Sequence, residues 1–406
     1  MPLPLLFDLD GAGMEALKRK CRPHVTCEQA VQIAEEVYGV KAEVAKKLDS
    51  YDDANFFLHT HAEEGPSRVL KVQNAADPPS LIALQLIIEK ALLAAGVRSF
   101  STFPTLAGMV VSSHASLRAD VDGEVVEHAV RMQSVVTGTV LVRSCLLSTP
   151  EWRQEAMYYL GRHIGGVDSA LLSAFTSAKD GAGWDTHLSA LSLSAPVTSA
   201  DVQTAAKRRT AWNVMHAQSV SKYAHVVGGE RRRAIVDQNL RAVALLLRSP
   251  PSSLRTSLIW NDANEQNILV TVPPRPSELR DACFASIDFG DACEGYLVSD
   301  PATCLGYMLM QLGDEVGDEE WMECAQRFVQ GVLEQVELSH SEKEAFVPFM
   351  VGRVTVSVVL SAYSFSLEPD NTYLLTTSEP GWRLLERVER LTPEVVASAL
   401  FPSLPS

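Results

Sequence analysis

The sequence predicts an α+β protein of two lobes, a small antiparallel-sheet N-lobe at residues 1–137 and a mainly helical C-lobe at residues 138–406. The chain has 406 residues, of which 46% are hydrophobic, and this is enough for two packed lobes. Strand patterns mixed with helices continue to about residue 137. Beyond Gly138 apolar residues recur mainly at helical spacing, so the change of pattern marks the predicted boundary.

The N-lobe pattern begins with a helix and continues with short strands. Residues 27–38 have apolar side chains on one helical face and lead to the first hairpin. Segment 48–58 has the form of a turn between two strands, because its Ser, Asp and Asn residues favour turns. Residues 68–72 are the next predicted strand, and after a proline-containing break residues 81–95 are predicted to be a helix.

The C-lobe pattern is helical with one interruption by short strands. Helices are expected at residues 151–174, 202–225 and 231–247, and again from Pro301 onwards, with 351–365 buried. The interruption consists of three apolar runs, at residues 258–259, 268–272 and 284–287. Loops held between short strands keep their side chains in register, so the polar residues beside these runs are the best candidates for chemistry.

The polar residues beside these strands are those that phosphoryl transfer requires. Asp262 can lie beside an attacking hydroxyl group, and Asn267 and Asp288 can hold Mg²⁺ against nucleotide phosphates through their side-chain oxygens. Each piece alone is weak, since an Asp five residues before an Asn is common and Asp-Phe-Gly can end an ordinary strand. Together and in this order they predict a kinase-type site.

A kinase-type site also requires a strand lysine for the α- and β-phosphates and a glutamate on the next helix to hold that lysine. Lys71 lies in the 68–72 strand, although by itself it would be taken for a solvated edge-strand lysine. Glu89 is the candidate partner, and Gln85, one helical turn earlier, is the alternative. Ser50 lies in the preceding turn, whose backbone N–H groups could bind a phosphate, although a plain hairpin turn fits as well.

These residues resemble the aminoglycoside phosphotransferase-like small-molecule kinases, and within that family the hydroxylysine kinase branch. The resemblance covers most of the chain and implies a bilobal, protein-kinase-like fold. The matching segments are 48–56, 69–74, 131–138, 184–185, 259–270, 286–301, 368–374 and 378–380. The catalytic and metal motifs are specific to the superfamily, whereas the Ser-Tyr-Asp-Asp turn and the C-terminal segment indicate the branch.

The resemblance implies roles for further residues. Residues 131–136 are similar to the strand that enters the hinge between lobes, where the backbone groups of residues such as Gln133 and Val135 would meet a purine; a plain buried strand also fits. Asp300 is expected at a helix N-cap and would brace the catalytic loop. Asp291 is a candidate to meet the amine of an amino-alcohol substrate, with a solvated turn aspartate as the alternative.

One position departs from the family pattern. The family usually has a histidine two residues before the catalytic aspartate, where this chain has Trp260. That histidine mainly organises the loop, and Trp260 can fill the same space but cannot reproduce both hydrogen bonds of an imidazole. We therefore expect weakened activity or a rearranged loop. Asn261, in place of the commoner glycine, is a smaller change.

The sequence predicts transfer of the γ-phosphoryl group of GTP or ATP, with Mg²⁺, to the hydroxyl of a small amine-bearing molecule, with 5-hydroxylysine as the favoured acceptor. Homoserine, choline, ethanolamine and an aminoglycoside are alternative acceptors. A nucleotide-binding pseudokinase with a regulatory role, suggested by Trp260, and a hydrolytic or sensory nucleotide-binding protein are alternatives of other classes. Retention of Lys71, Asp262, Asn267 and Asp288 argues against the pseudokinase.

Composition limits the partners. The net charge of −15 and the pI of about 5.2 argue against binding to nucleic acid or to an anionic membrane. Seven cysteines without paired metal spacing are typical of reduced thiols. The sequence has no secretory signal and no apolar run of about 20 residues. A cytoplasmic location is expected, and the sequence leaves the oligomeric state open.

Overall fold

The computed structural model describes residues 17–50, 52–60, 65–121, 123–141, 144, 148–180, 183–210, 212–367, 369 and 377–404. Its internal contacts divide the chain into two compact units. The first unit consists of Met1–Ala94, Ser99–Val136 and Ser177–Arg209, and the second of Ala95–Arg98, Thr137–Thr176 and Thr210–Ser406.

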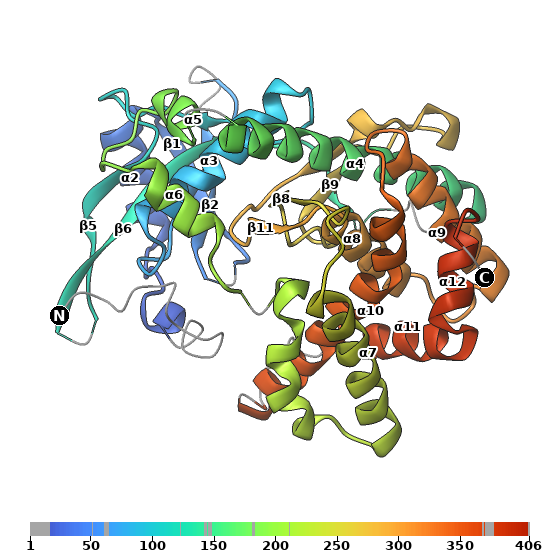
Figure 1. The fold of residues 1–406 in the computed structure, drawn as a ribbon. Coiled ribbons are helices and arrows are strands. Elements are labelled where there is room, and N and C mark those ends of the chain that lie inside the picture. The colour runs from blue at the N-terminus through green and yellow to red at the C-terminus, as the bar shows by residue number, and fades with distance from the viewer. Residues whose placement is uncertain are drawn as a thin grey trace. The chain divides into compact units, whose positions relative to one another are not determined.

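The first unit is built around an antiparallel sheet. In sheet order its strands are β1 (Ala42–Leu48), β2 (Ala54–Thr60), β3 (Arg68–Val72), β6 (Glu124–Ser134) and β4 (Thr102–Phe103). A further strand, β5 (Ser112–Val121), pairs with β6, and the two form a long hairpin (Figure 1). The small antiparallel sheet predicted for the N-terminal part of the chain is confirmed.

Helix α2 (Cys27–Tyr38) has the bounds that the sequence predicted, because both of its ends carry capping signals. Thr26 and Gln29 form a capping box, in which each side chain accepts a hydrogen bond from the other residue's backbone N–H. Gly39 ends the helix in the left-handed region, with φ of 69°. Ile33 and its neighbours on the buried face join the core formed by β1, β2 and β3.

Helix α3 (Pro79–Ala94) is buried on more than one face, because a later segment returns to cover it. The short helices α5 (Asp185–Ser189) and α6 (Ser199–Ala206) pack against α3. Leu191 and Leu193 pack against a small cluster to which α3 contributes Ile82 and Leu86. The predicted division of the chain at residue 137 stays a prediction, and the division by contacts differs from it in residues 95–98, 137 and 177–209.

The second unit contains two small antiparallel sheets that surround the predicted catalytic loops. One sheet has the order β10 (Phe284–Ser286), β9 (Ile268–Val270), β7 (Thr139–Val140). The other pairs β11 (Cys293–Tyr296) with β8 (Thr256–Ile259). The three apolar runs of the sequence therefore correspond to strands β8, β9 and β10.

Helices make up most of the second unit. They are α4 (Pro150–Asp180), which continues into the first unit, η4 (Val214–Val226), α7 (Glu230–Arg248), η5 (Pro276–Glu278), η6 (Asp281–Cys283), α8 (Ser299–Met310), α9 (Asp318–Leu333), α10 (His340–Leu367), α11 (Ser378–Leu391) and α12 (Pro393–Leu400). The predicted single helix at 202–225 is wrong. Helix α6 ends at Ala206, and Asn213 starts η4 by accepting a hydrogen bond from the backbone of Met215.

Helix α10 is the central helix of the second unit. It packs against η4, α7, α8, α11 and α12. By length and composition it could cross a membrane, but 78% of its most apolar window is buried inside the protein, which indicates a core helix. Residues 351–359 are buried as expected, whereas residues 360–365 are half-buried.

Candidate active site

The predicted catalytic loop, residues 260–267, lies between β8 and β9, and the second predicted loop follows β10 at residue 287. Strand pairing holds the ends of both loops, because β9 pairs with β10 and β8 pairs with β11. The backbone N–H of Ile287 donates to the carbonyl of Asn267 at 3.0 Å, which joins the two loops directly. The structure therefore brings together residues that are about twenty positions apart in the sequence.

Three side chains orient the carboxylate of Asp262. The amide of Asn267 donates to Oδ2 at 2.6 Å, and the amide of Asn264 donates to Oδ1 at 2.9 Å. Nη2 of Arg353, in α10, also donates to Oδ1, at 3.3 Å. Because these donors approach both oxygens, the carboxylate has a defined orientation, while its side chain remains 25% exposed.

Asp262 lies in acidic surroundings. Burial, together with the nearby carboxylates of Asp291 and Asp288, raises its pKa to about 7, although the Arg353 guanidinium acts in the opposite direction. Asp291 is half-buried, and its carbonyl accepts a hydrogen bond from the Asn261 side chain at 3.2 Å. A group of carboxylates such as this one favours a cation, either a metal ion or an ammonium group.

Asn267 and Asp288 fit the requirements of an Mg²⁺ site. The amide oxygen of Asn267 accepts no hydrogen bond from any described residue, so it is available as a ligand. Asp288 has an exposed side chain and a backbone φ of 59°. No group of three or more His, Cys, Asp or Glu residues suited to a metal occurs in the described part of the chain. Mg²⁺ commonly uses few protein ligands together with phosphate oxygens and water.

Asp300 connects the catalytic loop to helix α8. Its carboxylate accepts hydrogen bonds from the backbone N–H groups of Trp260, at 2.5 Å, and Asn261, at 2.7 Å. Asn261 has a φ of 66°, a conformation that these bonds help to hold. Burial raises the pKa of Asp300 to about 7, against the effect of the two hydrogen bonds. The predicted N-cap role is wrong, since α8 begins at Ser299 and Val298 is its N-cap.

Trp260 links the catalytic loop to the loop after β10. The residue is fully buried, and its indole N–H donates to the carbonyl of Asp288 at 2.7 Å. The ring meets Phe289 edge-on, with 5.8 Å between ring centroids. One of the hydrogen bonds that an imidazole could make is therefore supplied by an indole. The sequence did not predict this hydrogen bond between the two loops, although Trp260 stands out in it as a departure from the family pattern.

In the first unit, Lys71 has a different partner from the one predicted. Its Nζ lies 2.7 Å from Oδ2 of Asp53, and the backbone N–H of Asn74 donates to the other oxygen of Asp53. Asp53 was missed as a site residue. The signal for it was the Ser-Tyr-Asp-Asp turn, because the register between β2 and β3 aligns Asn55 with Lys71 and so places Asp53 beside the end of β3.

Glu89 does not pair with Lys71 in this structure. Its carboxylate accepts hydrogen bonds from the backbone and hydroxyl of Thr102, at 2.6 and 2.5 Å. The alternative, Gln85, accepts from Arg131 at 2.6 Å instead. Arg131 lies opposite Lys71 in the register of β3 and β6, and it is the buried cation that contacts Gln85. Both predictions for α3 assumed that Lys71 was the nearest cation.

The remaining predicted nucleotide-binding residues also lie in the first unit. Ser50 is exposed in the turn between β1 and β2, Gln133 is buried in β6, and Val135 is half-buried just after that strand. Their roles stay predictions. Residues 51, 368 and 370–376, which carry part of the turn and of the C-terminal segment that indicated the branch, lie outside the described residues.

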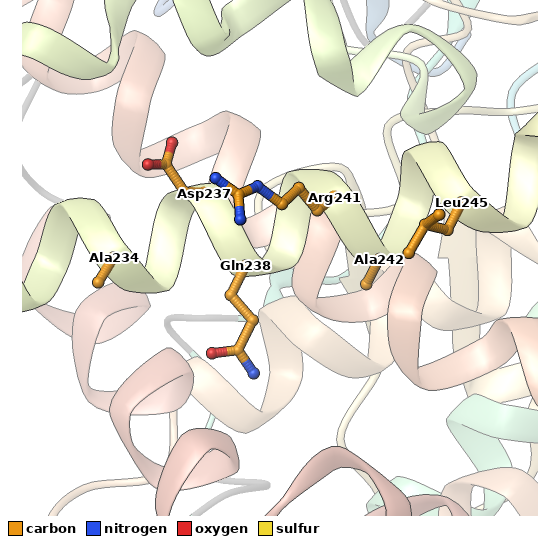
Figure 2. Close-up of a pocket in the computed structure, with 6 residues that line it drawn as sticks. All are labelled: Ala234, Asp237, Gln238, Arg241, Ala242 and Leu245. Atoms are coloured by element: carbon orange, nitrogen blue, oxygen red, sulfur yellow. The ribbon is translucent and has the colours of Figure 1, made fainter.

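A cavity of about 550 Å³ lies over α7, away from these loops in the sequence (Figure 2). Its lining residues all come from that helix and are Ala234, Asp237, Gln238, Arg241, Ala242 and Leu245. None of the predicted site residues lines it.

The oriented carboxylate of Asp262, with the side chains of Asn267 and Asp288 on the two joined loops, is the arrangement of a phosphotransferase. Residues 44–340 match the Phosphotransferase enzyme family, and the chain belongs to this family. It is a small-molecule kinase that acts on an alcohol group, as the sequence predicted.

Two relatives that match this chain over nearly its whole length carry the name of a small-molecule kinase. Hydroxylysine kinase of Bos taurus is 27% identical over 408 residues, covering 98% of this chain and 97% of the relative. Hydroxylysine kinase of Xenopus laevis is 25% identical over 394 residues, covering 95% of each chain.

Solved structures show the same fold. Amicoumacin kinase hAmiN, in complex with AMP-PNP, Ca²⁺ and its ligand, has a TM-score of 0.61 and 14% identity, covering 93% of this chain and 96% of that one. A microcompartment-associated aminopropanol kinase has a TM-score of 0.58 and 18% identity, covering 88% and 96%. The predicted α+β, bilobal, protein-kinase-like fold is confirmed.

Proposed function

We propose that this kinase transfers the γ-phosphoryl group of GTP or ATP, with Mg²⁺, to the hydroxyl group of 5-hydroxylysine. The single observation that supports the reaction best is the arrangement around Asp262, whose carboxylate is oriented by Asn264, Asn267 and Arg353 and remains partly exposed. The proposal of 5-hydroxylysine is supported by two relatives of nearly equal length that carry the name hydroxylysine kinase.

In this proposal each residue has one task. Asp262 accepts or orients the proton of the acceptor hydroxyl group. Asn267 and Asp288 hold Mg²⁺, which when bound neutralises charge on the nucleotide phosphates. Lys71 binds the α- and β-phosphates, and Asp53 takes the place proposed for Glu89 as the residue that orients Lys71.

The other proposed contacts concern the two small molecules. Ser50 lies in the turn that would cover the phosphates, and the backbone of Gln133 and Val135 would meet the purine. Asp291 would meet the ammonium group of the acceptor, because it lies close enough to Asp262 to affect the pKa of that carboxyl. A cytoplasmic location belongs to the same proposal.

Trp260 motivates a second candidate function, a nucleotide-binding pseudokinase. Its indole makes one hydrogen bond to the following loop where the family histidine could make two. The carboxylate and amide groups of Asp262, Asn267 and Asp288 are all retained, which favours the active kinase.

The test is release of nucleoside diphosphate with Mg²⁺ and either ATP or GTP, across 5-hydroxylysine, homoserine, choline, ethanolamine and an aminoglycoside. We expect one nucleotide to be consumed rapidly with 5-hydroxylysine. A response to another acceptor alone would replace the substrate, whereas nucleotide binding without any turnover would favour the pseudokinase. Turnover that no acceptor accelerates would indicate a hydrolytic or sensory protein.

A further inference from the structure

Helix α10 carries one arginine, Arg353, in its buried apolar stretch. The side chain is 2% exposed, although an arginine is rarely buried to this degree unless its charge and its donors are used. Its guanidinium lies 4.7 Å from the ring centre of Trp212 and 5.3 Å from that of Tyr307. These rings stabilise the cation through their faces but accept no in-plane hydrogen bond.

The hydrogen-bonding capacity of Arg353 is largely unused. Nη2 donates to Oδ1 of Asp262 at 3.3 Å. Nε and Nη1 are buried and have no hydrogen-bond partner among the described residues. Buried donors without acceptors destabilise a protein, so a guanidinium kept in this state at the predicted base calls for an acceptor that the chain itself does not supply.

Carboxylates of the described residues surround Arg353 but do not use its two free donors. The carboxylates of Asp291 and Asp288 act on Asp262, and the Arg353 guanidinium opposes their effect. Arg353 also acts on the carboxyl groups of Glu265 and Asp300. The charge of Arg353 is thus balanced by protein carboxylates, whereas the two free donors are not satisfied by them.

We propose that Arg353 binds a carboxylate of the phosphoryl acceptor and so selects hydroxy amino acids over simple amino alcohols. This inference rests on the proposed function and narrows its substrate class. An acceptor with a hydroxyl, an ammonium and a carboxylate group matches Asp262, Asp291 and Arg353 in turn. Charge-assisted hydrogen bonds from guanidinium to carboxylate are strong and directional. Choline and ethanolamine have no group that could accept them.

Trp212 is the less buried of the two rings that cover Arg353. Tyr307 is buried in α8, whereas Trp212 is half-buried and lies just before η4. In this proposal, a carboxylate bound at the buried Nε and Nη1 lies beside the indole of Trp212, so binding of the acceptor changes the environment of that indole. The fluorescence of Trp212 is therefore a direct readout of carboxylate binding.

Two pairs of acceptors that differ only in the carboxylate test the proposal on the unmodified enzyme. The first pair is 5-hydroxylysine and 1,5-diaminopentan-2-ol, and the second is homoserine and 3-aminopropan-1-ol. We expect kcat/KM to be about 100-fold higher or more for the member that carries the carboxylate. The member without it would leave the buried donors of Arg353 unpaired, which disfavours its binding strongly. Equal kcat/KM values within a pair would overturn the proposal.

Variants separate substrate binding from orientation of Asp262. Arg353→Met should raise KM for 5-hydroxylysine by about 100-fold and leave KM for 1,5-diaminopentan-2-ol nearly unchanged. Arg353→Lys keeps the charge but not the planar donors, so its KM for 5-hydroxylysine should lie between those of the wild type and Arg353→Met. A loss of kcat that is equal for both acceptors would show that Arg353 only positions Asp262. Arg241→Met, which removes an exposed arginine from α7 (Figure 2), is the matched control.

Fluorescence titrations give a second measurement that does not depend on turnover. 5-Hydroxylysine should change the tryptophan emission of the wild-type protein, and this change should be absent in Trp212→Phe and in Arg353→Met. An unchanged response in both variants would contradict carboxylate binding at Arg353. If no acceptor accelerates turnover of ATP or GTP, the proposed function itself fails. Rapid turnover with both 5-hydroxylysine and ethanolamine, at similar kcat/KM, would retain the proposed function and overturn only the role of Arg353.

Discussion

Replacing Trp260 by phenylalanine should weaken both the second unit and its proposed metal site. The substitution keeps an aromatic ring beside Phe289 but removes the indole N–H that donates to the carbonyl of Asp288 at 2.7 Å. Asp288 has a φ of 59°, in a region that non-glycine residues rarely adopt. The hydrogen bond therefore supports an unfavourable backbone conformation at the residue that is proposed to bind Mg²⁺.

The expected loss of stability follows from two contributions. Losing the hydrogen bond costs about 1–2 kcal/mol. The missing part of the indole leaves a cavity at a fully buried position, which adds about 1 kcal/mol. The sum of about 2–3 kcal/mol lowers Tm by about 4–12 °C in a domain of this size. Because the affected carbonyl belongs to a proposed metal ligand, Mg²⁺-dependent nucleotide affinity should fall about 10–100-fold.

Trp321 provides the matched control. It is equally buried, in α9, and its indole makes no hydrogen bond to the part of the chain that the structure describes. Trp321→Phe should therefore cost only the cavity, about 1 kcal/mol, with unchanged nucleotide affinity. Thermal denaturation gives Tm, and titration calorimetry with and without Mg²⁺ gives the affinities. The reasoning is refuted if the two variants lose the same stability and both keep their Mg²⁺-dependent nucleotide affinity.

Three further predictions concern single carboxylates of the second unit. Asp262→Ala should lower kcat by about 10²-fold or more while nucleotide affinity changes only a few-fold, because a base acts in the transition state; calorimetry that finds lost nucleotide binding in a folded variant would contradict this role. Asp288→Ala should remove the Mg²⁺ dependence of nucleotide binding, and unchanged dependence would refute the ligand assignment. Asp168 is buried in α4, and neither carboxylate oxygen has a hydrogen-bond partner among described residues, so burial raises its pKa well above the ordinary value. A raised pKa means that its contribution to stability is present below the unfolded pKa of about 4 and is lost as pH rises. Asp168→Asn should thus be more stable than the wild type in denaturant unfolding at pH 7 but not at pH 4, and an equal difference at both pH values would contradict the assignment.

Local patterns in the sequence determined much of the fold. Helix α2 has its predicted bounds because Thr26, Gln29 and Gly39 cap it within a few residues of its own ends. The strands around the catalytic loop were predictable for a similar reason, since short apolar runs between polar turns report local structure. The order Asp262, Asn267, Asp288 was informative because phosphoryl transfer restricts which residue types can do this chemistry.

Only the tertiary structure decided which side chains meet. Lys71 pairs with Asp53, and Gln85 with Arg131, because strand register sets these neighbours, and the helical pattern of α3 carries no information about them. Residues 185–206 pack on α3 because that helix is apolar on more than one face, and their own pattern does not indicate which helix they cover. The same holds for Arg353, whose position in an apolar helix gave no sign of its contact with Asp262. A sequence determines local conformation through short-range physics, whereas contacts between distant residues depend on how complete elements pack.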